Sequence, residues 1–416
     1  MKKVLFITTR LFWPTDSGRK LSLFYYCKGL HDKYDCEIYL YSFLEAGQGE
    51  KDCDSKPDFI KEIRLAKPIA KGEKLKNLLI RTFLLRRWPM QCSLFFSKEN
   101  GESIKRYAED IQPDLIITDM IRTSMYYDYF RNIPCRKILD MDDMLSKRYK
   151  RQLHSSYASN ISGQYGKKLP GFLNKLLENG LVKNLVLKIE ANLTERAEIF
   201  YSKAYDKVIF VSPRETEDMN RKTPGKAVTI SVGINPMNDT DRSVTKEPGL
   251  LSYVGNLGVA ANIDTLDWII RKILPEVSHK IKFMVIGKCP DEIKSKYKDC
   301  PQVYFTGRVD KLEDYIGKSE AFLSPILYGT GIKTKILEAM AIGVPVITND
   351  VGAEGIAIEN GKHLWVENGI EAIAEKVDYV LENPEESHLM AENGRKLVED
   401  KYCWENIWKN FAVLFE

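Results

Sequence analysis

The stretch YGTGIKTKILEAMAIGVPVITND, residues 328–350, combines residue types that could hold an anion. An apolar run ending in proline precedes a glycine-rich loop, and KTKILEAMA after the loop is a strong helix former. Free backbone N–H groups and the dipole at a helix N-terminus both favour an anion. Lys333 and Lys335 add the full charges that a diphosphate would require. Glu338, one turn later, is placed to accept hydrogen bonds from two ribose hydroxyls. The alternative is an ordinary capped helix with solvated lysines.

Carboxylates form a second group of candidate residues, in the first half of the chain. Asp119 directly follows the apolar run DLIIT, and Asp140, Asp142 and Asp143 lie in LDMDDM, at the end of another such run. Paired carboxylates after a strand could hold Mg²⁺. Such residues also cap strand ends and helices, so the sequence leaves both interpretations open.

Short apolar runs alternate with helical patterns along the chain, and these elements must position the candidate residues. Such alternation is typical of parallel sheets covered by helices. The runs expected as strands are 4–8, 36–42, 114–118, 137–141, 207–212, 250–255, 282–287, 303–307, 321–325, 344–348 and 363–366. With 416 residues, the chain is expected to form two domains. The polar, turn-rich residues 233–249 are the expected linker between a first domain, 1–232, and a second domain, 250–401.

Charge is distributed unevenly along the chain. Residues 1–240 carry 41 Lys and Arg against 30 Asp and Glu, whereas the remaining residues carry 21 against 28. A basic first half favours an anionic partner, although an uneven solvated surface is the simpler alternative. Residues 71–88, KGEKLKNLLIRTFLLRRW, combine this charge with leucines at partly helical spacing. We expect either peripheral contact with an anionic membrane through this segment or packing of its apolar face on the sheet.

The cellular compartment is suggested by weak signals. The eight cysteines are scattered without metal-ligand spacing, which indicates free thiols in a reducing cytosol. The apolar run after Met1 is too short for a secretion signal, and no stretch is apolar enough to span a bilayer. We therefore expect a cytoplasmic protein, either free in the cytosol or at the inner face of the cytoplasmic membrane. The five histidines form no constellation and so indicate no metal or other cofactor.

The run GTGIKTKILEAMAIGVPVITNDVGAEGI resembles the nucleotide-sugar signature of the family-4 retaining glycosyltransferases, also called glycosyl transferases group 1. YVGNL, TGRVDKLEDYI and the linker run SVGIN follow the order of the family, and YCWENIWKNF is similar to its last helix. The resemblance, which is to bacterial surface-polysaccharide enzymes in particular, implies the α/β GT-B fold. In that fold two Rossmann-like doubly wound parallel-sheet domains face a central cleft. The first domain would bind the acceptor and carry the returning helix 402–416, and the second would bind the sugar donor.

The resemblance also implies roles for individual residues. Glu338 matches the second glutamate of the family's E-x7-E motif, which holds the donor ribose; the first glutamate would fall at Thr330. Asn256 stands where many relatives have a basic residue, which shifts the neutralisation of phosphate to the two lysines. The residues expected to bind the donor are Gly18, Asn256, Arg308, Val309, Gly331, Ile332, Lys333, Thr334, Lys335, Glu338 and Glu354.

On the acceptor side, the resemblance suggests that Asp140, Asp142 and Asp143 line the site, and Asp119 is the candidate base for the acceptor hydroxyl. Gly18 belongs to the first strand-to-helix turn, WPTDSGRKL, where relatives often have a glycine pair. Arg19 occupies the place of the second glycine.

The expected function is therefore retaining, metal-independent hexosyl transfer. The sugar would move from a UDP- or GDP-sugar to a carbohydrate or lipid-linked acceptor during cell-surface polysaccharide synthesis. A nucleotide-sugar epimerase of the same fold and a non-catalytic nucleotide-sugar binding protein are the alternatives. No strand is followed by G-x-G-x-x-G, which argues against a nicotinamide dehydrogenase, and no nucleic-acid-binding module is recognisable.

Overall fold

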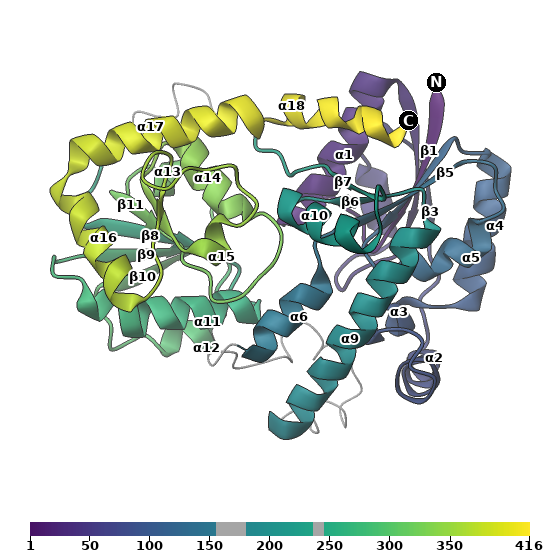
Figure 1. The fold of residues 1–416 in the computed structure, drawn as a ribbon, viewed down its shortest axis with the longest axis horizontal. Helices are drawn as coiled ribbons and strands as arrows, with labels where there is room; N and C mark the ends of the chain where they lie inside the picture. Colours follow the sequence, from purple (N-terminus) through teal and green to yellow (C-terminus); the bar gives the residue numbers. More distant parts are fainter. Residues whose placement is uncertain (155–179, 236–244) are drawn as a thin grey trace. The chain divides into compact units, whose positions relative to one another are not determined.

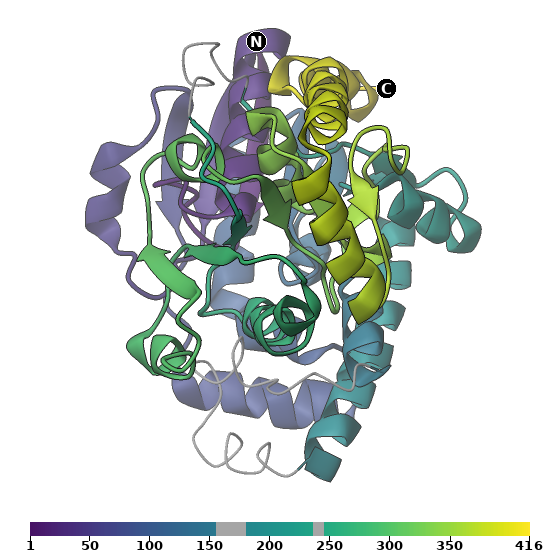
Figure 2. The same cartoon turned by 90° about the vertical axis from the view of Figure 1, so that its left-hand side faces the viewer.

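The computed structural model of the chain describes residues 1–154, 180–235 and 245–416. They form two compact units, each with one sheet covered by helices (Figures 1 and 2). The first unit consists of Met1–Tyr149, Val186–Gly233 and Trp404–Glu416, and the second of Lys150–Leu185 and Ile234–Cys403.

These units differ in one respect from the expected domains. The sequence suggested an unbroken first domain up to residue 232, whereas the described residues 150–154 and 180–185 belong to the second unit. Residues 155–179, which the expected first domain included, lie outside the described residues. The middle of the expected linker, residues 236–244, lies outside the described residues.

A seven-stranded parallel sheet, in the order β3-β2-β1-β4-β5-β6-β7, forms the centre of the first unit. Its strands are β1 Lys2–Thr8, β2 Cys36–Ser42, β3 Ile60–Leu65, β4 Leu115–Asp119, β5 Arg136–Asp142, β6 Lys207–Phe210 and β7 Ala227–Thr229. The chain proceeds outward from β1 to β3 and then returns to β4, so the strand order reverses between β1 and β4. Doubly wound sheets bind ligands at the carboxyl ends of the strands that flank such a reversal.

Helices connect these strands, and a further helix belongs to the C-terminal segment. They are α1 Gly18–Tyr34, α2 Lys71–Asn77, α3 Met90–Phe95, α4 Lys98–Ile111, α5 Tyr127–Phe130, α6 Leu145–His154, α9 Gly180–Ala204, α10 Pro213–Lys222 and α18 Trp404–Trp408. The shorter turns are η1 Glu50–Ser55, the π-helical η2 Leu78–Leu84, η3 Ser124–Tyr126 and η7 Lys409–Leu414. The last residues of α6 and the first of α9 belong to the second unit.

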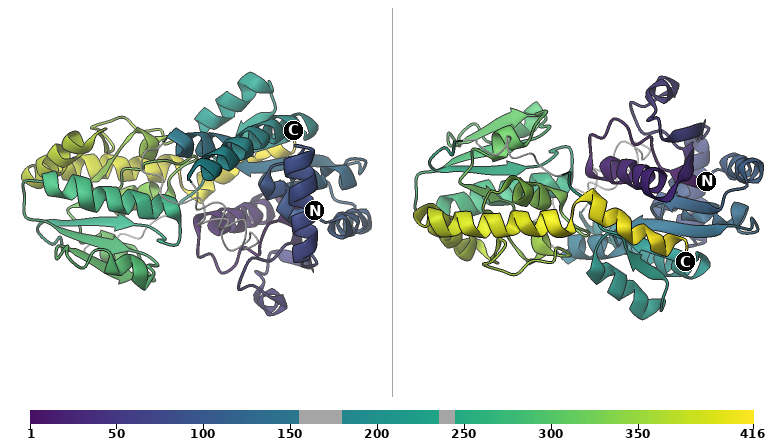
Figure 3. Two further views of the ribbon diagram at one scale, coloured as in Figure 1. Left: turned by 90° about the horizontal axis from the view of Figure 1, so that it is seen from below. Right: turned by 90° about the horizontal axis from the view of Figure 1, so that it is seen from above.

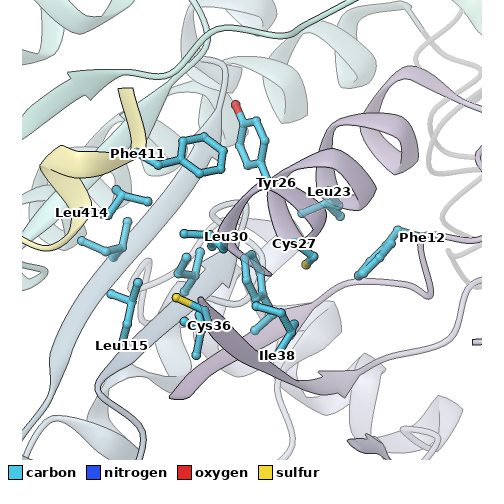
Figure 4. Packing of buried hydrophobic residues seen from close by; sticks show 14 of the residues in the cluster. Phe12, Leu23, Tyr26, Cys27, Leu30, Cys36, Ile38, Leu115, Phe411 and Leu414 are labelled. Atoms are coloured by element: carbon cyan, nitrogen blue, oxygen red, sulfur yellow. The ribbon is translucent and has the colours of Figure 1, made fainter. Parts of the chain in front are cut away.

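The C-terminal segment, Trp404–Glu416, completes the core of the first unit. Its yellow ribbon lies beside the purple α1 in the right-hand view of Figure 3, and Phe411 packs edge-on against Tyr26 at 5.3 Å between ring centroids (Figure 4). Trp404 stacks on Tyr25 at 4.7 Å. A Cβ atom at Gly29 would lie 2.2 Å from the ring of Trp408, so only glycine allows α1 to approach this segment so closely.

Helix α9 supplies two buried glutamates that cap other helices of the first unit. Glu190 accepts a hydrogen bond from the Met90 backbone N–H at 2.7 Å, at the start of α3. Glu198 accepts one from the Ser146 backbone N–H at 3.0 Å, at the start of α6. A carboxylate is favourable at a helix N-terminus, but burial raises the pKa of both glutamates to about 7.

The second unit contains a six-stranded parallel sheet in the order β10-β9-β8-β11-β12-β13. Its strands are β8 Leu250–Val254, β9 Lys282–Ile286, β10 Val303–Gly307, β11 Ala321–Leu323, β12 Val346–Thr348 and β13 Trp365–Val366. Here the order reverses between β8 and β11, which predicts a ligand site where these two strands end.

Helices cover both faces of the second sheet, with α11 below it and α14 and α17 above it in Figure 1. The helices and turns are α11 Ala260–Trp268, η5 Ile269–Ile273, η6 Leu274–Glu276, α12 Asp291–Ser295, α13 Glu313–Ile316, α14 Thr334–Ile342, α15 Asp350–Ala353, α16 Ile370–Glu382 and α17 Pro384–Lys401. Beside the strand reversal, Gly287 adopts φ +131°, and a Cβ there would lie 2.4 Å from the Gly255 carbonyl oxygen. Glycine at this position therefore lets the chain after β9 approach the chain after β8.

The prediction of two parallel sheets is confirmed, and every strand expected from the sequence overlaps one in the structure. The sequence analysis missed β3 and β7, which lie at the two edges of the first sheet. Three of the six residues of β3 are charged, and β7 has only three residues. Such short or partly polar edge strands lack the apolar run that reveals a central strand.

Candidate functional site

The loop from Gly329 to Lys333 joins β11 to α14 at the strand reversal of the second sheet. Gly331 has φ +67°, in the left-handed region that favours glycine. The backbone N–H groups of Gly331, Ile332, Thr334 and Lys335 have no hydrogen-bond acceptor within the described chain. Because these groups lie at or just before the N-terminus of a nine-residue helix, they form a site suited to an anion.

The two lysines of this loop make different contacts. The ammonium of Lys333 donates to the carbonyl oxygens of Thr330, at 3.0 Å, and Gly331, at 2.7 Å, and thereby fixes the loop. Lys335 instead donates to the Val254 carbonyl at the end of β8, at 3.0 Å. Burial, together with the neighbouring charge of Lys333, lowers the pKa of Lys335 to about 7. Lys335 therefore links the start of α14 to the strand on the other side of the reversal.

Glu338 lies one turn into α14 and is half-buried. Its carboxylate has no hydrogen-bond partner within the described parts of the chain. Burial raises the pKa of Glu338, and only the charge of Lys335 opposes this shift. A half-buried carboxylate without a donor is costly to the fold, so the position is suited to a ligand that brings hydroxyl groups.

Arg151, near the end of α6, contacts this loop from within the second unit. Its guanidinium binds both carboxylate oxygens of Glu354, at 2.5 and 2.9 Å, and donates to the Gly329 carbonyl at 2.6 Å. This bidentate contact holds Glu354, which is buried, against the glycine-rich loop. Sequence analysis did not single out Arg151, because a lone arginine on a polar helix carries no local signal.

The remaining residues expected to bind the donor lie after other strands of the same sheet. The exposed Asn256 follows β8, and its side-chain oxygen accepts from the Gly258 N–H at 2.9 Å, which shapes the turn. Arg308 is exposed and Val309 half-buried, directly after β10. Parallel strands end at one edge of a sheet, so these residues share an edge with the anion site, but no hydrogen bond joins their side chains to the loop in the described structure.

In the first unit, Arg19 brings together three of the predicted carboxylates at the strand reversal. Its guanidinium lies 2.6 Å from Asp119, 2.9 Å from Asp140 and 3.3 Å from Asp142. Asp119 also accepts hydrogen bonds from the backbone and hydroxyl groups of Thr9. The sequence had marked Arg19 only as a departure from a glycine pair, whereas the side chain is the central cation of this cluster.

The carboxylates in the cluster differ in their ability to take up a proton. Burial opposes ionisation of Asp119, but the charges of Arg19 and Arg10 and the Thr9 hydroxyl outweigh it and lower the pKa. Burial raises the pKa of Asp140. Burial and the charges of Asp143 and Asp140 raise the pKa of Asp142 to about 7, although Arg19 opposes the shift. Asp142 is thus better suited than Asp119 to accept a proton near neutral pH.

Asp142 is also distinguished by its backbone, since it adopts φ +65° at the end of β5. Its side chain is 22% exposed, whereas those of Asp119 and Asp140 are fully buried. Asp143 is paired instead with Arg148 of α6.

Two further predictions concern metal binding and the first turn. Among the residues that the structure describes, no group of His, Cys, Asp or Glu is arranged to hold a metal ion. Gly18 is exposed as the first residue of α1, directly before Arg19, and so lies beside the carboxylate cluster. Its predicted contact with the sugar donor stays a prediction.

Comparison with known proteins finds a family match for the part of the chain that contains the loop before α14. Residues 248–383 match the family model described as "Glycosyl transferases group 1". The capsular polysaccharide biosynthesis glycosyltransferase CapM of Staphylococcus aureus is 25% identical over 189 residues, which cover 44% of this chain and 49% of CapM. The matched stretches cover 60% or less of each of the curated relatives.

Solved structures match over the whole chain at lower identity. Sucrose-phosphate synthase from Thermosynechococcus elongatus has a TM-score of 0.71 at 16% identity, covering 100% of this chain and 98% of the synthase. Anabaena HepE, crystallised in complex with UDP, has a TM-score of 0.66 at 12% identity, covering 99% of both chains. These similarities confirm the predicted two-domain fold.

Proposed function

We propose, from the match of residues 248–383 to the glycosyl transferases group 1 family, that the protein is a glycosyltransferase of polysaccharide synthesis. It transfers a hexose, with retention of configuration, from a UDP- or GDP-sugar to a carbohydrate or lipid-linked acceptor. Similarity to CapM, named for capsular polysaccharide biosynthesis, and to HepE, which binds UDP in its crystal structure, supports the acceptor class and the nucleotide.

The observation that carries the proposal is the pairing of an anion site with an unpartnered carboxylate on α14. The free N–H groups of Gly331, Ile332 and Thr334 would bind the donor diphosphate. Glu338 would accept hydrogen bonds from the ribose hydroxyls and thereby satisfy its own buried charge. A nucleoside diphosphate offers both groups in one ligand.

The same residues would serve the chemistry. Cleavage of the bond between sugar and phosphate leaves positive charge on the sugar ring and negative charge on the departing diphosphate. Fixed N–H groups and the N-terminal end of the α14 dipole would stabilise that negative charge without a metal ion. Lys335, with its lowered pKa, would become fully protonated as the charge develops.

Other positions have narrower proposed roles. Arg308 and Val309 would contact the nucleobase at the end of β10, and Asn256 would approach the phosphates. Arg151 would keep Glu354 against the loop. In the first unit, Asp140 and Asp143 would shape the acceptor side, and Asp142 is a better candidate than Asp119 for the group that takes the acceptor proton.

The direct test is to incubate the purified protein with UDP- and GDP-sugars, with and without candidate acceptors, and to measure the nucleotide diphosphate released. Release that requires an acceptor supports the proposal, and the product's anomeric configuration tests retention. Turnover after exhaustive chelation tests metal independence. Acceptor-free change of the donor sugar would instead indicate an epimerase, and tight binding without turnover would indicate a binding protein.

Location is a separate part of the proposal. No helix in the described ranges is long and apolar enough to cross a membrane. Activity on a lipid-linked acceptor would nevertheless bring the protein to the inner face of the cytoplasmic membrane. The predicted membrane contact of residues 71–88 concerns the first unit alone and does not depend on the sugar-transfer reaction.

A further inference from the structure

We propose that α2 and η2, residues 71–84, together with Leu85, Arg86 and Arg87, form a surface that docks on an anionic lipid membrane. This membrane-docking surface would insert four apolar side chains between lipid headgroups, while lysines and arginines around them bind the lipid phosphates. In Figure 1, α2 lies at the margin of the first unit.

The inner side of the segment is anchored to the first unit. Asn77 donates to the Phe96 carbonyl at 2.9 Å, and the hydroxyls of Thr82 and Ser93 lie 2.8 Å apart in a buried contact. Leu78 is completely buried. The sequence left open whether the apolar residues pack inward or face outward, and the structure divides them between the two sides.

The outer side carries an unusual amount of apolar surface. Leu84 is 75% exposed, Leu85 60%, Leu79 52% and Ile80 38%. Of the nine large apolar residues exposed in the described chain, these four lie within seven consecutive positions. Scattered exposed leucines need no explanation, but a contiguous group rimmed by charged residues is typical of an interaction site.

The chain conformation helps to keep these residues on the outside. Residues Leu78–Leu84 form a π-helical turn, and such turns are rare and often occur at functional sites. The backbone then reverses at Arg86, whose φ is +48°, and Arg87 bonds back to the Arg81 carbonyl at 2.8 Å. The side chain of Arg81 lies over the rings of Trp88 and Phe96. The reversal places Leu84, Leu85, Arg86 and Arg87 together at an exposed tip.

Charge identifies the partner. Residues 71–88 contain six Lys and Arg and one acidic residue, Glu73. Lys71, Lys76, Arg86 and Arg87 are exposed, and among the described residues only Arg87 of these four has an ion-pair partner, Asp128 at 3.9 Å. A second copy of this chain would oppose its own positive charges across such a contact, which costs binding free energy. A membrane of anionic lipids supplies both negatively charged headgroups and an apolar layer for the exposed leucines.

Vesicle flotation tests this inference on the full chain. We expect the protein to float at low salt with vesicles of equal parts phosphatidylglycerol and phosphatidylcholine, and much less with phosphatidylcholine alone. The double variant Leu84→Ser/Leu85→Ser should bind roughly tenfold more weakly, because two side chains no longer enter the apolar layer. The double variant Lys71→Gln/Lys76→Gln should bind roughly thirtyfold more weakly at low salt, with a smaller difference at high salt.

Matched controls come from the second unit. Leu389, on α17, is 61% exposed, and Lys298 is exposed without a partner shown in the described structure. Leu389→Ser and Lys298→Gln should bind vesicles like the wild type. All variants should keep the wild-type melting temperature and nucleotide affinity, since no altered side chain is buried; if the leucine variant misfolds, the lysine variant carries the test.

Two results would overturn the inference. One is a wild-type protein that stays unbound with anionic vesicles at low salt, in which case the surface would serve another partner, such as an acidic protein. The other is vesicle binding that both the leucine and the lysine double variants leave unchanged. Sugar transfer to a soluble acceptor should be equal in all variants, so failure of the membrane inference is distinguishable from failure of the proposed function.

Discussion

Replacing Glu338 by glutamine should weaken nucleotide binding without weakening the fold. The carboxylate is expected to accept hydrogen bonds from two ribose hydroxyls, whereas an amide of the same shape offers only one acceptor oxygen. Loss of a hydrogen bond to a charged group costs about 1–3 kcal/mol. This corresponds to roughly a 5- to 150-fold rise in the dissociation constant of UDP or GDP, whichever is the native nucleotide. Glu338→Ala should fall in the same range.

The effect on stability should have the opposite sign. In the free protein the half-buried Glu338 carboxylate has no hydrogen-bond donor in the described structure, and burial raises its pKa. Below pH 4.5, the usual pKa of glutamate, the carboxyl group is neutral in both the folded and the unfolded protein. As the pH rises through the higher pKa of the folded state, the wild type loses stability. Near neutral pH, Glu338→Gln should therefore unfold at the same or a slightly higher denaturant concentration than the wild type.

Titration calorimetry and urea unfolding, measured on the same preparations, separate the two effects. Glu375 is exposed on α16, away from α14, and Glu375→Gln is the matched control for loss of one negative charge from the second unit. It should change neither quantity. Unchanged nucleotide affinity in Glu338→Gln would refute the assignment. A clear loss of stability would show that the carboxylate supports the fold instead.

Three further predictions concern groups whose pKa lies near 7. When nucleotide binds at about pH 8, the wild type should take up a proton, because the diphosphate raises the lowered pKa of Lys335. The variant Lys335→Met should take up no such proton. Calorimetry in buffers of different ionisation enthalpy measures the proton uptake. Wild-type turnover should fall as the pH drops below about 7, and Asp142→Asn should be slower and lack this limb; a retained limb would exclude Asp142 as the proton acceptor. Glu198 has its pKa raised from 4.5 to about 7, so it stabilises the fold when protonated and this contribution is lost as the pH rises through 7. The stability of Glu198→Gln relative to the wild type should therefore rise by about 2–3 kcal/mol as the pH increases from about 5 to 8. A difference in urea unfolding that stays the same over this pH range would contradict a buried charge on Glu198.

The local parts of the proposed sugar-donor site could be predicted from the sequence. Gly331, the start of α14 and the position of Glu338 are encoded within a single short stretch, and the structure places them as a loop followed by a helix. The contacts of Lys335 could not be predicted, because its acceptor is the Val254 carbonyl, far away in the sequence. A lysine next to a phosphate site is naturally expected to point at phosphate, whereas the half-buried Lys335 donates to a carbonyl at the end of β8.

Long-range charge pairing explains the other differences. Arg19 follows β1, and its partners Asp119 and Asp140 lie on β4 and β5, which become its neighbours only when the sheet forms. Three carboxylates spaced along a chain look alike in the sequence. Their different pKa values arise from burial and from their distances to one guanidinium, which the fold alone determines.

The return of the C-terminal segment to the first unit has a consequence for how the protein is made. Trp404, Trp408 and Phe411 belong to the same core as the first strands, yet the ribosome adds them after the entire second unit. The second unit can therefore fold during synthesis, as domains generally do. The first unit has to wait with part of its apolar core uncovered, although its chain begins first. For this protein the order of synthesis and the order of completion are reversed, and chaperone dependence should centre on the unit that is translated first.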